Sequence, residues 1–357
     1  MPRRDLPFSC GRAACGILPP HILIAICENG TVEERGRALA TLILSERLRE
    51  RRALLSSLPS RTPAGEERRT VYDAKHRESL PGKLVRAEGD PPSTDAAVNE
   101  AYDGAGATYD LYEQVYGRIS IDGLGMRIDS SVHYGVGYDN AFWNGAQMVY
   151  GDGDGKLFER FTKPLDVIGH ELTHGVTARE ANLDYHDQPG ALNESLSDVF
   201  GSLVKQHALR QTAEQADWII GAGLFTPRVH GLGIRSMKAP GTAYDDPVLG
   251  RDPQPAHMKD YVTGPEDDGG VHVNSGIPNH AFYLAAHAIG GYAWEKAGKI
   301  WYAALTDRLR HDSDFAAAAL LTAAAAAGLF GPGGKEETAV REAWRAVGVS
   351  SGRAPGG

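Results

Sequence analysis

Two histidines spaced four residues apart carry the strongest chemical signal in the sequence, within the pentapeptide His-Glu-Leu-Thr-His at residues 170–174. On a helix, His170 and His174 project from one face. Both imidazoles can then reach a single zinc ion at about 2.0–2.1 Å. Glu171 lies on a neighbouring part of that face, where it can approach a water molecule without binding the metal. Because paired histidines are also common on ordinary helix surfaces, the pentapeptide needs a third ligand to predict a zinc site.

A short acidic segment downstream supplies that third ligand. Glu194 follows His174 by 20 residues, within the sequence Asn-Glu-Ser-Leu-Ser-Asp at 193–198. A catalytic zinc site has three protein ligands and one open position, so we predict Glu194 as the third. Asn193 and Asp198 are placed in the layer behind the ligands, with Asp198 accepting the outer N–H of a histidine, most simply His170. The alternative is that Glu194 only complements a helix dipole.

The two histidines require a helix, and the surrounding sequence predicts one. Residues 70–185 contain short alternating apolar runs separated by glycine, aspartate and tyrosine, which is typical of strands and turns. This stretch closes with a helix that begins near Pro164, a residue type suited to the first helical turn, and includes His174. We therefore predict an N-terminal, strand-rich catalytic lobe that ends in the metal-binding helix.

The rest of the chain is predicted to be mainly helical. Within residues 186–350, composition and periodicity indicate helices at 192–207, 277–289, 293–309 and 313–327. Ser313 or Asp314 is expected to cap the last of these. A chain of 357 residues exceeds what one compact core usually holds. We therefore predict an α+β protein of two lobes, followed by a tail at 351–357.

The first 69 residues differ from the body of the chain. They carry 12 basic and 8 acidic residues, or +4, whereas the remainder carries 25 and 38, or −13. Opposite charges suggest that this segment contacts the body, although a solvated basic helix at 32–58 explains the same pattern. All three cysteines, Cys10, Cys15 and Cys27, lie here, so no disulfide framework can hold the main fold together.

Composition gives no reason to expect a membrane or nucleic-acid partner. No apolar run approaches the ~20 residues that cross a bilayer, and the net charge of −9 does not favour nucleic acid. The first 20 residues lack the apolar core of ~7–15 residues found in a standard secretion signal. We expect a monomer that is cytoplasmic or is secreted by a leaderless route.

Several blocks follow one another in order along the chain: Tyr-Asp-Ala-Lys at 72–75, Asn-Ala-Phe-Trp-Asn-Gly-Ala-Gln-Met-Val-Tyr-Gly-Asp-Gly-Asp-Gly at 140–155, the histidine pentapeptide, Asn-Glu-Ser-Leu-Ser-Asp at 193–198, Arg-Ser-Met at 235–237 and Gly-Gly-Val-His-Val-Asn-Ser-Gly-Ile at 269–277. From about Val71 to about Val347 the sequence resembles the thermolysin-type neutral zinc metalloendopeptidases. Upstream, Ile-Leu-Pro-Pro-His-Ile-Leu at 17–23 resembles the short propeptide of their protealysin-like subgroup. The resemblance implies a two-lobed thermolysin-like zincin, with one catalytic zinc in a cleft between the lobes.

The resemblance also implies catalytic roles. Glu171 would be the general base that activates water and then passes the proton to the leaving amine. His272 and Tyr185 would donate hydrogen bonds to the oxyanion of the tetrahedral intermediate. Asp267 would orient His272.

Substrate contacts are implied in the same way. Asn140 and the backbone of Ala141 would bind the peptide as an extended strand, and Arg235 would hold a substrate carbonyl. An apolar pocket for the residue after the scissile bond predicts cleavage before Leu, Phe, Ile or Val, although the sequence alone does not separate such a pocket from core. Its implied lining is Phe158, Phe161, Val167, Ile220, Leu224 and Ile234.

The family's structural calcium sites are depleted in this sequence. Asp166 and Asp217 match ligands of a double site, but Lys205 stands among them. A calcium ion needs about 6–8 oxygen ligands, and other matching positions also hold non-acidic residues: Ile219, Ala222, Gly223 and, at a loop site, Leu232. We expect the Lys205 ammonium to bridge the two aspartates. Glu88 and Asp90 are candidate ligands of a weak remaining site, and calcium is not expected to be essential.

Residues 1–69 are interpreted as an inhibitory propeptide and linker. The segment expected in the cleft is Ile17, Leu18, Pro19 and Pro20. Proline has a fixed φ and no N–H, so it is a poor partner for cleavage. Binding of zinc by the Cys15 thiolate is the alternative. Cleavage is expected in the exposed linker between Leu55 and Val71, with Thr70–Val71 as one candidate bond.

Two other functions fit parts of the pattern. One is a catalytically silent zinc-binding module, which the glutamate at 171 disfavours. The other is a zinc esterase or amidase, which the strand-binding block and the apolar pocket disfavour. The expected partners are therefore peptide and protein substrates, together with the chain's own propeptide as an intramolecular inhibitor.

Overall fold

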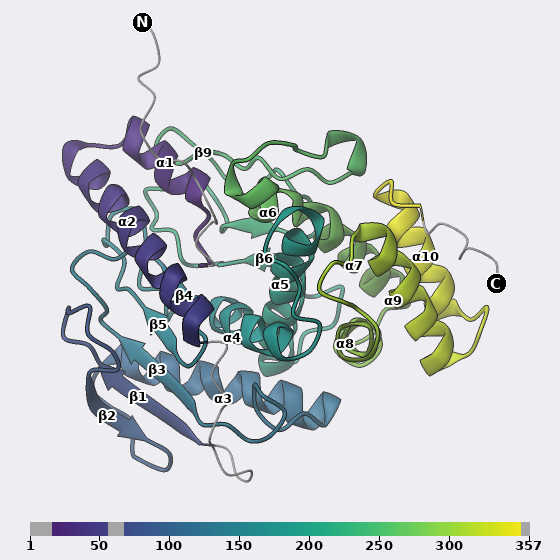
Figure 1. Ribbon diagram of the computed structural model, residues 1–357, viewed down its shortest axis with the longest axis horizontal. Coiled ribbons are helices and arrows are strands. Elements are labelled where there is room, and N and C mark those ends of the chain that lie inside the picture. The colour runs from purple at the N-terminus through teal and green to yellow at the C-terminus, as the bar shows by residue number, and fades with distance from the viewer. Residues whose placement is uncertain (1–15, 56–67, 351–357) are drawn as a thin grey trace, which may run out of the picture.

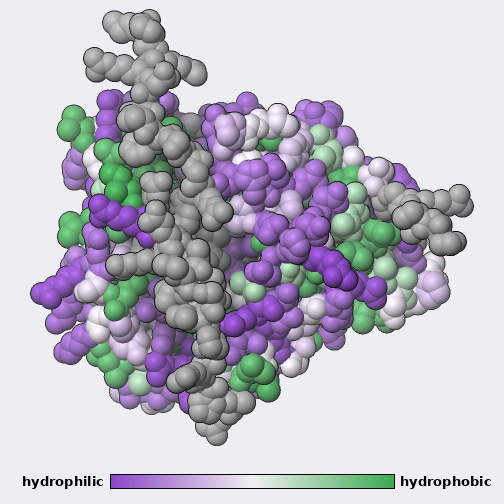
Figure 2. All heavy atoms as spheres, viewed as in Figure 1, coloured by the Kyte–Doolittle hydropathy of each residue, from purple (hydrophilic) through white to green (hydrophobic). Residues whose placement is uncertain are grey.

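The computed structural model describes residues 16–55 and 68–350, and it has the two lobes predicted from the sequence (Figure 1). Helices α4 and α5 lie between a strand-rich lobe and a helical lobe. In the view of Figure 2, hydrophilic side chains cover much of the described surface and apolar ones stand in small groups. None of the helices in the described part is both long and apolar enough to span a membrane.

The strand-rich lobe is built on a five-stranded mixed sheet in the order β2-β1-β3-β5-β4. The two central pairings, β1 with β3 and β3 with β5, are parallel, whereas the outer two are antiparallel. Its strands are β1 (Arg69–Asp73), β2 (Lys83–Ala87), β3 (Ile128–Val132), β4 (Ala141–Trp143) and β5 (Met148–Tyr150). Strand β4 is therefore an edge strand.

One long helix in this lobe was absent from the prediction of strands and turns. Helix α3 (Ala96–Tyr116) packs on β1, β3 and α4, and its N-cap Asp95 accepts a hydrogen bond from the backbone of Ala97. Glycine is unfavourable inside a helix, yet Gly104 lies where α3 packs closely on α4. A Cβ at Gly104 would approach the Ile168 side chain of α4 to 2.3 Å. Close packing of two helices thus outweighs local propensity.

The helical lobe agrees with the prediction in type and differs at some boundaries. Helix α4 (Leu165–Arg179) ends the strand-rich part, and the helices after it are α5 (Asp187–Leu209), α6 (Asp267–Asn274), α7 (Gly276–Ile289), α8 (Ala297–Asp307), α9 (Phe315–Phe330) and α10 (Lys335–Ala346). The prediction had no α6 or α10. Pro164 lies at the N-cap of α4, and Asp314 is the residue that caps α9, through a bond from the backbone of Ala317.

Short hairpins and one 3-10 turn connect the helices of this lobe. They are β6 (Ile219–Ile220) with β7 (Arg235–Ser236), β8 (Asp245–Asp246) with β9 (Gly250–Arg251), and η1 (Met258–Asp260). Strand β7 is the element that carries Arg235. The start of α6 has a left-handed backbone at Asp268, Gly269 and Gly270, which turns the chain so that His272 faces α5.

The N-terminal segment lies across both lobes as two helices, α1 (Pro20–Asn29) and α2 (Val32–Leu55), with α1 near β9 and α2 alongside β4 and β5 (Figure 1). Contact with the body was expected from its positive charge. Among the described residues, however, ion pairs of both polarities join α2 to the body: Arg37–Asp139, Glu34–Arg228 and Glu33–Lys156. Net charge alone therefore does not explain the docking.

The candidate cleavage bond Thr70–Val71 was wrong. Both residues lie inside β1, which is hydrogen-bonded to β2 on one side and β3 on the other, and Val71 is buried. A protease binds its substrate as an extended exposed strand, so a bond within a paired interior strand is inaccessible. Of the expected window, residues 56–67 lie outside the described part of the chain.

Candidate active site

Close contact between α4 and α5 brings the predicted metal ligands together. Helix α4 carries His170, Glu171 and His174, and α5 carries Glu194. A Cβ at Gly201 of α5 would lie 2.5 Å from the backbone oxygen of Asp166 and 2.9 Å from the backbone nitrogen of His170. The bare glycine thus lets the two helices approach at the level of the histidines.

The inner nitrogens of the two histidines face each other. Their Nε2 atoms are 3.1 Å apart. The outer Nδ1 of His170 lies 2.8 Å from the Asp198 carboxylate, and that of His174 lies 2.8 Å from Asn193 Oδ1 and 3.0 Å from Ser197 Oγ. Carboxylate and amide oxygens accept hydrogen bonds, so each Nδ1 carries the proton and each Nε2 presents a lone pair. Two converging lone pairs fit a metal cation.

Glu194 completes the donor set. Its carboxylate oxygens lie 3.5 Å from His170 Nε2 and 3.4 Å from His174 Nε2. One donor atom from each of the three residues falls within 4.8 Å of the others, and all three side chains are buried. Although burial opposes it, the surrounding histidines lower the pKa of Glu194 to about 2. Burial lowers the pKa of His170 to about 4, against the pull of Asp198. An ionised carboxylate and neutral imidazole are the forms that bind zinc.

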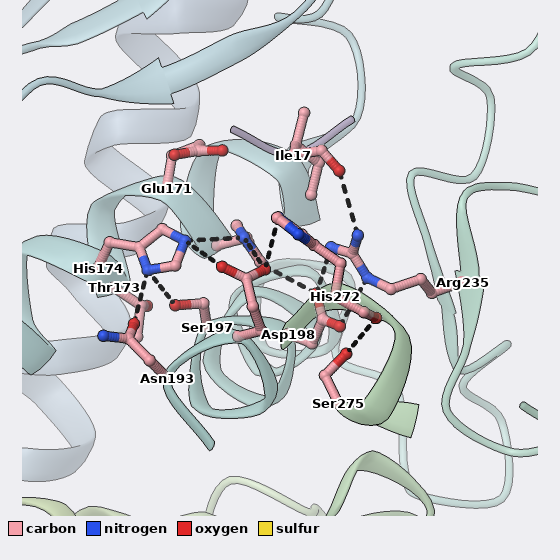
Figure 3. A network of polar contacts seen from close by, with 12 residues as sticks. Ile17, Glu171, Thr173, His174, Asn193, Ser197, Asp198, Arg235, His272 and Ser275 are labelled. Carbon is pink, nitrogen blue, oxygen red and sulfur yellow. Dashed lines mark hydrogen bonds and ion pairs between the residues drawn. The ribbon is translucent and has the colours of Figure 1, made fainter. Parts of the chain in front are cut away.

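Asp198 joins the metal ligands to a buried arginine (Figure 3). It accepts hydrogen bonds from Arg235 Nε at 2.8 Å and Nη2 at 2.7 Å, besides its contact with His170. The amide of Asn279 donates a further bond of 2.8 Å to the same carboxylate. The side chains of Asp198 and Arg235 are almost completely enclosed, so the arginine is fixed relative to the ligands.

His272 and Tyr185 lie on the other side of Glu194. Asp267 accepts from His272 Nδ1 at 2.6 Å, which leaves Nε2 directed inward. The Tyr185 hydroxyl donates to Glu194 at 2.5 Å and lies 3.3 Å from His272 Nε2. Although burial opposes it, the carboxylates of Asp267 and Glu194 raise the pKa of His272 to about 9. The protonated imidazole of His272 and the phenol of Tyr185 are thus both available as hydrogen-bond donors beside Glu194.

Glu171 is buried beside the ligands without belonging to the donor set. Its Oε2 accepts a hydrogen bond of 2.9 Å from the backbone N–H of Trp143 in β4. This bond fixes the carboxylate between the edge strand and the histidine face of α4. A carboxylate held in this way can take a proton from a nearby water molecule.

Ile17 and Leu18 of the N-terminal segment lie next to these groups. Ile17 N donates to the carbonyl of Ala141 at 3.2 Å, and Leu18 bonds the Asn140 side chain through its N–H at 2.9 Å and its carbonyl at 3.3 Å. Figure 3 shows the Ile17 carbonyl pointing toward Arg235, whose Nη1 donates to it at 3.1 Å. Ile17 and Leu18, rather than the prolines, make these contacts. Pro19 caps α1 and Pro20 is its first residue.

The expected pocket residues are all fully buried. They belong to one apolar cluster that also contains Ile17 and Leu18: Phe158, Phe161, Val167, Ile220, Leu224 and Ile234. Cys15, the alternative zinc ligand from the N-terminal segment, lies outside the described residues.

Lys205 occupies the position expected for it. Its Nζ lies 2.6 Å from Asp166, 2.9 Å from Asp217 and 2.7 Å from the carbonyl of Ile219. Although burial alone would lower it, the two carboxylates raise the pKa of Lys205. Of the other candidate calcium ligands, Glu88 binds Arg69 through both carboxylate oxygens.

Some residues around the site escaped the sequence analysis. Ser197 contacts His174 and lies four residues after Asn193 on α5, a spacing that places both on one helix face and would have indicated it. Asn279 and the backbone of Trp143 reach the site through tertiary packing, and no local sequence signal identifies them. Gln254, which bonds the carbonyl of His272 at 2.8 Å, is another such case.

A strand-rich lobe and a helical lobe that meet at a buried His-His-Glu donor set define a zinc metallopeptidase. Residues 60–178 match the family model described as "Thermolysin metallopeptidase, catalytic domain". Residues 181–349 match the model described as "Thermolysin metallopeptidase, alpha-helical domain". The chain belongs to the thermolysin metallopeptidase family. It is accordingly a zinc-dependent endopeptidase.

Several proteins are similar over nearly the whole chain. An extracellular metalloprotease of Pectobacterium carotovorum subsp. carotovorum is 53% identical over 339 residues, which cover 95% of this chain and 97% of that protein. Protease PrtS of a Photorhabdus species is 48% identical over 342 residues, or 94% of this chain and 92% of that one. The solved precursor of protealysin, a metalloproteinase from Serratia proteamaculans, is 54% identical, with a TM-score of 0.87 over 94% of this chain and all of that one.

Proposed function

We propose that the chain is the zymogen of an endopeptidase that cleaves before large apolar residues and is inhibited by its own residues 1–69. The observation that carries this proposal is the peptide strand at Ile17 and Leu18, which is held through its backbone beside the His170, His174 and Glu194 donor set. Zinc at that donor set supplies a Lewis acid for the scissile carbonyl.

Glu171 is proposed as the general base. It is close to the ligands, buried, and oriented by the Trp143 N–H. It takes a proton from the attacking water and delivers it to the leaving nitrogen. A positioned acid–base group of this kind contributes about 10²–10⁴ in rate.

His272 and Tyr185 are proposed to stabilise the oxyanion. Both donors converge beside Glu194, and Asp267 fixes the orientation of the imidazole. The raised pKa of His272 keeps it protonated at neutral pH. Charged donors already in place stabilise developing negative charge without reorganisation.

A substrate is proposed to bind as Ile17 and Leu18 of the N-terminal segment do. Its contacts place Ile17 opposite Ala141 and Leu18 opposite Asn140, with Arg235 on the Ile17 carbonyl. Ile17 then corresponds to the residue after the scissile bond, and its side chain shares a cluster with the six apolar pocket residues. The bond from Ile17 N–H to Ala141 favours amides, since an ester has no N–H to donate. This argues against the esterase alternative.

The same strand supports the zymogen assignment, because a substrate cannot occupy a cleft that Ile17 and Leu18 already fill. We propose release by cleavage between residues 56 and 68, in the linker that precedes β1. The related proteins named as extracellular favour action outside the cell. We further propose that the active enzyme is monomeric and acts on peptides and proteins without a membrane or nucleic-acid partner.

Casein digestion by the purified protein, with and without a zinc chelator, tests the proposal. We expect zinc-dependent cleavage, with mass spectra that show Leu, Phe, Ile or Val after most cut bonds. Mass spectrometry of the active protein should show a chain that begins between residues 57 and 69. Full activity from an intact 357-residue chain would contradict the zymogen assignment.

A further inference from the structure

A binding place for a guanidinium group lies next to Asn140, at Asp139, and in this structure Arg37 of α2 fills it. Arg37 Nη2 donates to Asp139 Oδ1 at 2.7 Å and to the carbonyl of Gly153 at 3.0 Å, while Nε donates to Asp139 Oδ2 at 3.2 Å. Arg37 itself belongs to the segment that we propose is removed. The pocket belongs to the catalytic body and is left behind.

Backbone geometry shapes this pocket for a flat cation. Gly153 has φ +70, and a Cβ there would approach the carbonyl of Glu159 to 2.3 Å, so only glycine presents this carbonyl. A Cβ at Gly137 would lie 3.0 Å from the Arg37 guanidinium. Gly137 therefore leaves one face open for the planar group, while Asp139 and the Gly153 carbonyl bind its edge.

The charge of the pocket is not balanced by the catalytic body. Asp139 is 5% exposed at its side chain, and within residues 16–55 and 68–350 its carboxylate accepts hydrogen bonds only from Arg37. Burial raises the pKa of Asp139 to about 6, with Asp154 and Asp152 adding to the rise and Arg37 opposing it. A carboxylate in these surroundings is stabilised by a cation, so loss of Arg37 leaves a site that favours a replacement cation.

The register of the bound strand leads toward this pocket. Ile17 bonds the Ala141 carbonyl and Leu18 bonds the Asn140 side chain, so the bound segment runs in the opposite direction to residues 140–141. A peptide that continues in this direction brings its next residue toward Asp139. In the N-terminal segment the next residue is Pro19, the N-cap of α1, so the chain leaves this direction there. Arg37 of α2 occupies the pocket instead. A substrate that stays extended reaches the same place with its own side chain.

We propose that Asp139, the Gly153 carbonyl and Gly137 form a subsite for an arginine of the substrate, three to four residues after the scissile bond. The inference rests on the proposed function and specifies its substrate class. Arginine is favoured over lysine because its planar fork matches a carboxylate and a carbonyl together, whereas an ammonium is a point charge.

The test uses processed enzyme, with loss of residues 1–69 checked by mass spectrometry. Quenched fluorescent peptides carry Leu after the scissile bond and either arginine or citrulline at one position from the third to the sixth residue after that bond. Citrulline keeps the shape and removes the charge. We expect kcat/KM for arginine to exceed that for citrulline about 10-fold at the third or fourth residue, with lysine between them, since a charge-assisted hydrogen bond contributes about this much.

Variants assign the preference to the pocket. In Asp139→Asn the arginine-to-citrulline ratio should fall to about 1, whereas Glu214→Gln, which removes an exposed acid elsewhere, should keep it. If Asp139→Asn does not fold, Asp139→Ser is used in its place. The comparison of arginine and citrulline peptides on the wild-type enzyme tests the preference without any variant. Equal cleavage of arginine and citrulline peptides by the wild type, or a ratio that survives in the Asp139 variants, overturns the subsite. Failure to cut any peptide or casein would instead reject the proposed function.

Discussion

Arg235 and Asp198 form a buried two-point ion pair, with Arg235 Nε and Nη2 at 2.8 and 2.7 Å from the two carboxylate oxygens. The same carboxylate holds His170, and the same guanidinium holds the Ile17 carbonyl. Metal binding and recognition of the peptide backbone therefore share one anchor.

Replacement of Asp198 by Asn should weaken both functions together. Loss of an outer-layer carboxylate typically costs about 10–100-fold in metal affinity, and Arg235 would remain as a buried charge without its partner. We expect weaker zinc binding in a chelator competition and a raised KM for peptides. The exposed Asp312→Asn is the matched control. A raised KM with unchanged zinc affinity would separate the two roles.

Glu171→Gln should separate catalysis from metal binding. The amide keeps the shape and can still contact the Trp143 N–H, but it cannot accept a proton as a base. We expect zinc content near one ion per chain, measured by elemental analysis, and a loss of about 10²–10⁴ in kcat. If processing is autocatalytic, the variant remains full length. Casein cleavage at the wild-type rate would exclude Glu171 as the base.

Lys205 should make calcium unnecessary for stability. The ammonium supplies the positive charge between Asp166 and Asp217, so thermal melts with calcium and with a calcium-selective chelator should coincide. Lys205→Met leaves the fully buried Asp166 without this partner and should cost about 3–5 kcal/mol. Lys205→Glu adds an oxygen ligand and should make the melt depend on calcium. A large calcium effect on the wild type would contradict the prediction.

Docking of the N-terminal segment should weaken in acid because of His21. Burial lowers the pKa of this histidine from 6.5 to about 4, although Asp267 raises it, and its ring contacts the Tyr244 hydroxyl at 3.0 Å. The docked state binds fewer protons than the released state, so docking has its full strength above pH 6.5 and is lost progressively down to pH 4. By linkage, the equilibrium constant for docking is about 30-fold lower at pH 5 than at neutral pH.

Hydrogen exchange of the α1 amides in the full-length Glu171→Gln protein tests the effect of His21. The exchange rates are corrected for the intrinsic effect of pH, and zinc is kept in the buffer. His21→Gln retains a neutral hydrogen-bonding group and should remove most of the pH dependence. The same acid response in both proteins would assign it to other groups.

The sequence predicts most of this site because its chemistry is local. His170 and His174 lie one helical turn apart on α4, and Asn193, Glu194 and Asp198 fall within six consecutive residues of α5, so helix geometry gathers each group and a single helix contact joins the two. The remainder depends on tertiary packing. Helix α3 contains glycines that propensity disfavours, and only its contact with Ile168 explains Gly104. Asn279 and Trp143 reach the site from separate elements, with no spacing that links them to it.

The N-terminal strand also changes the sheet itself. Strand β4 lies at the edge of the sheet, and the Ile17 N–H donates one backbone hydrogen bond to the carbonyl of Ala141 on this edge. An open edge is a template on which another chain can pair, and proteins usually protect such edges. If residues 1–69 are removed as we propose, this edge becomes open. We then expect the shortness of β4, three residues, to limit pairing between copies of the enzyme.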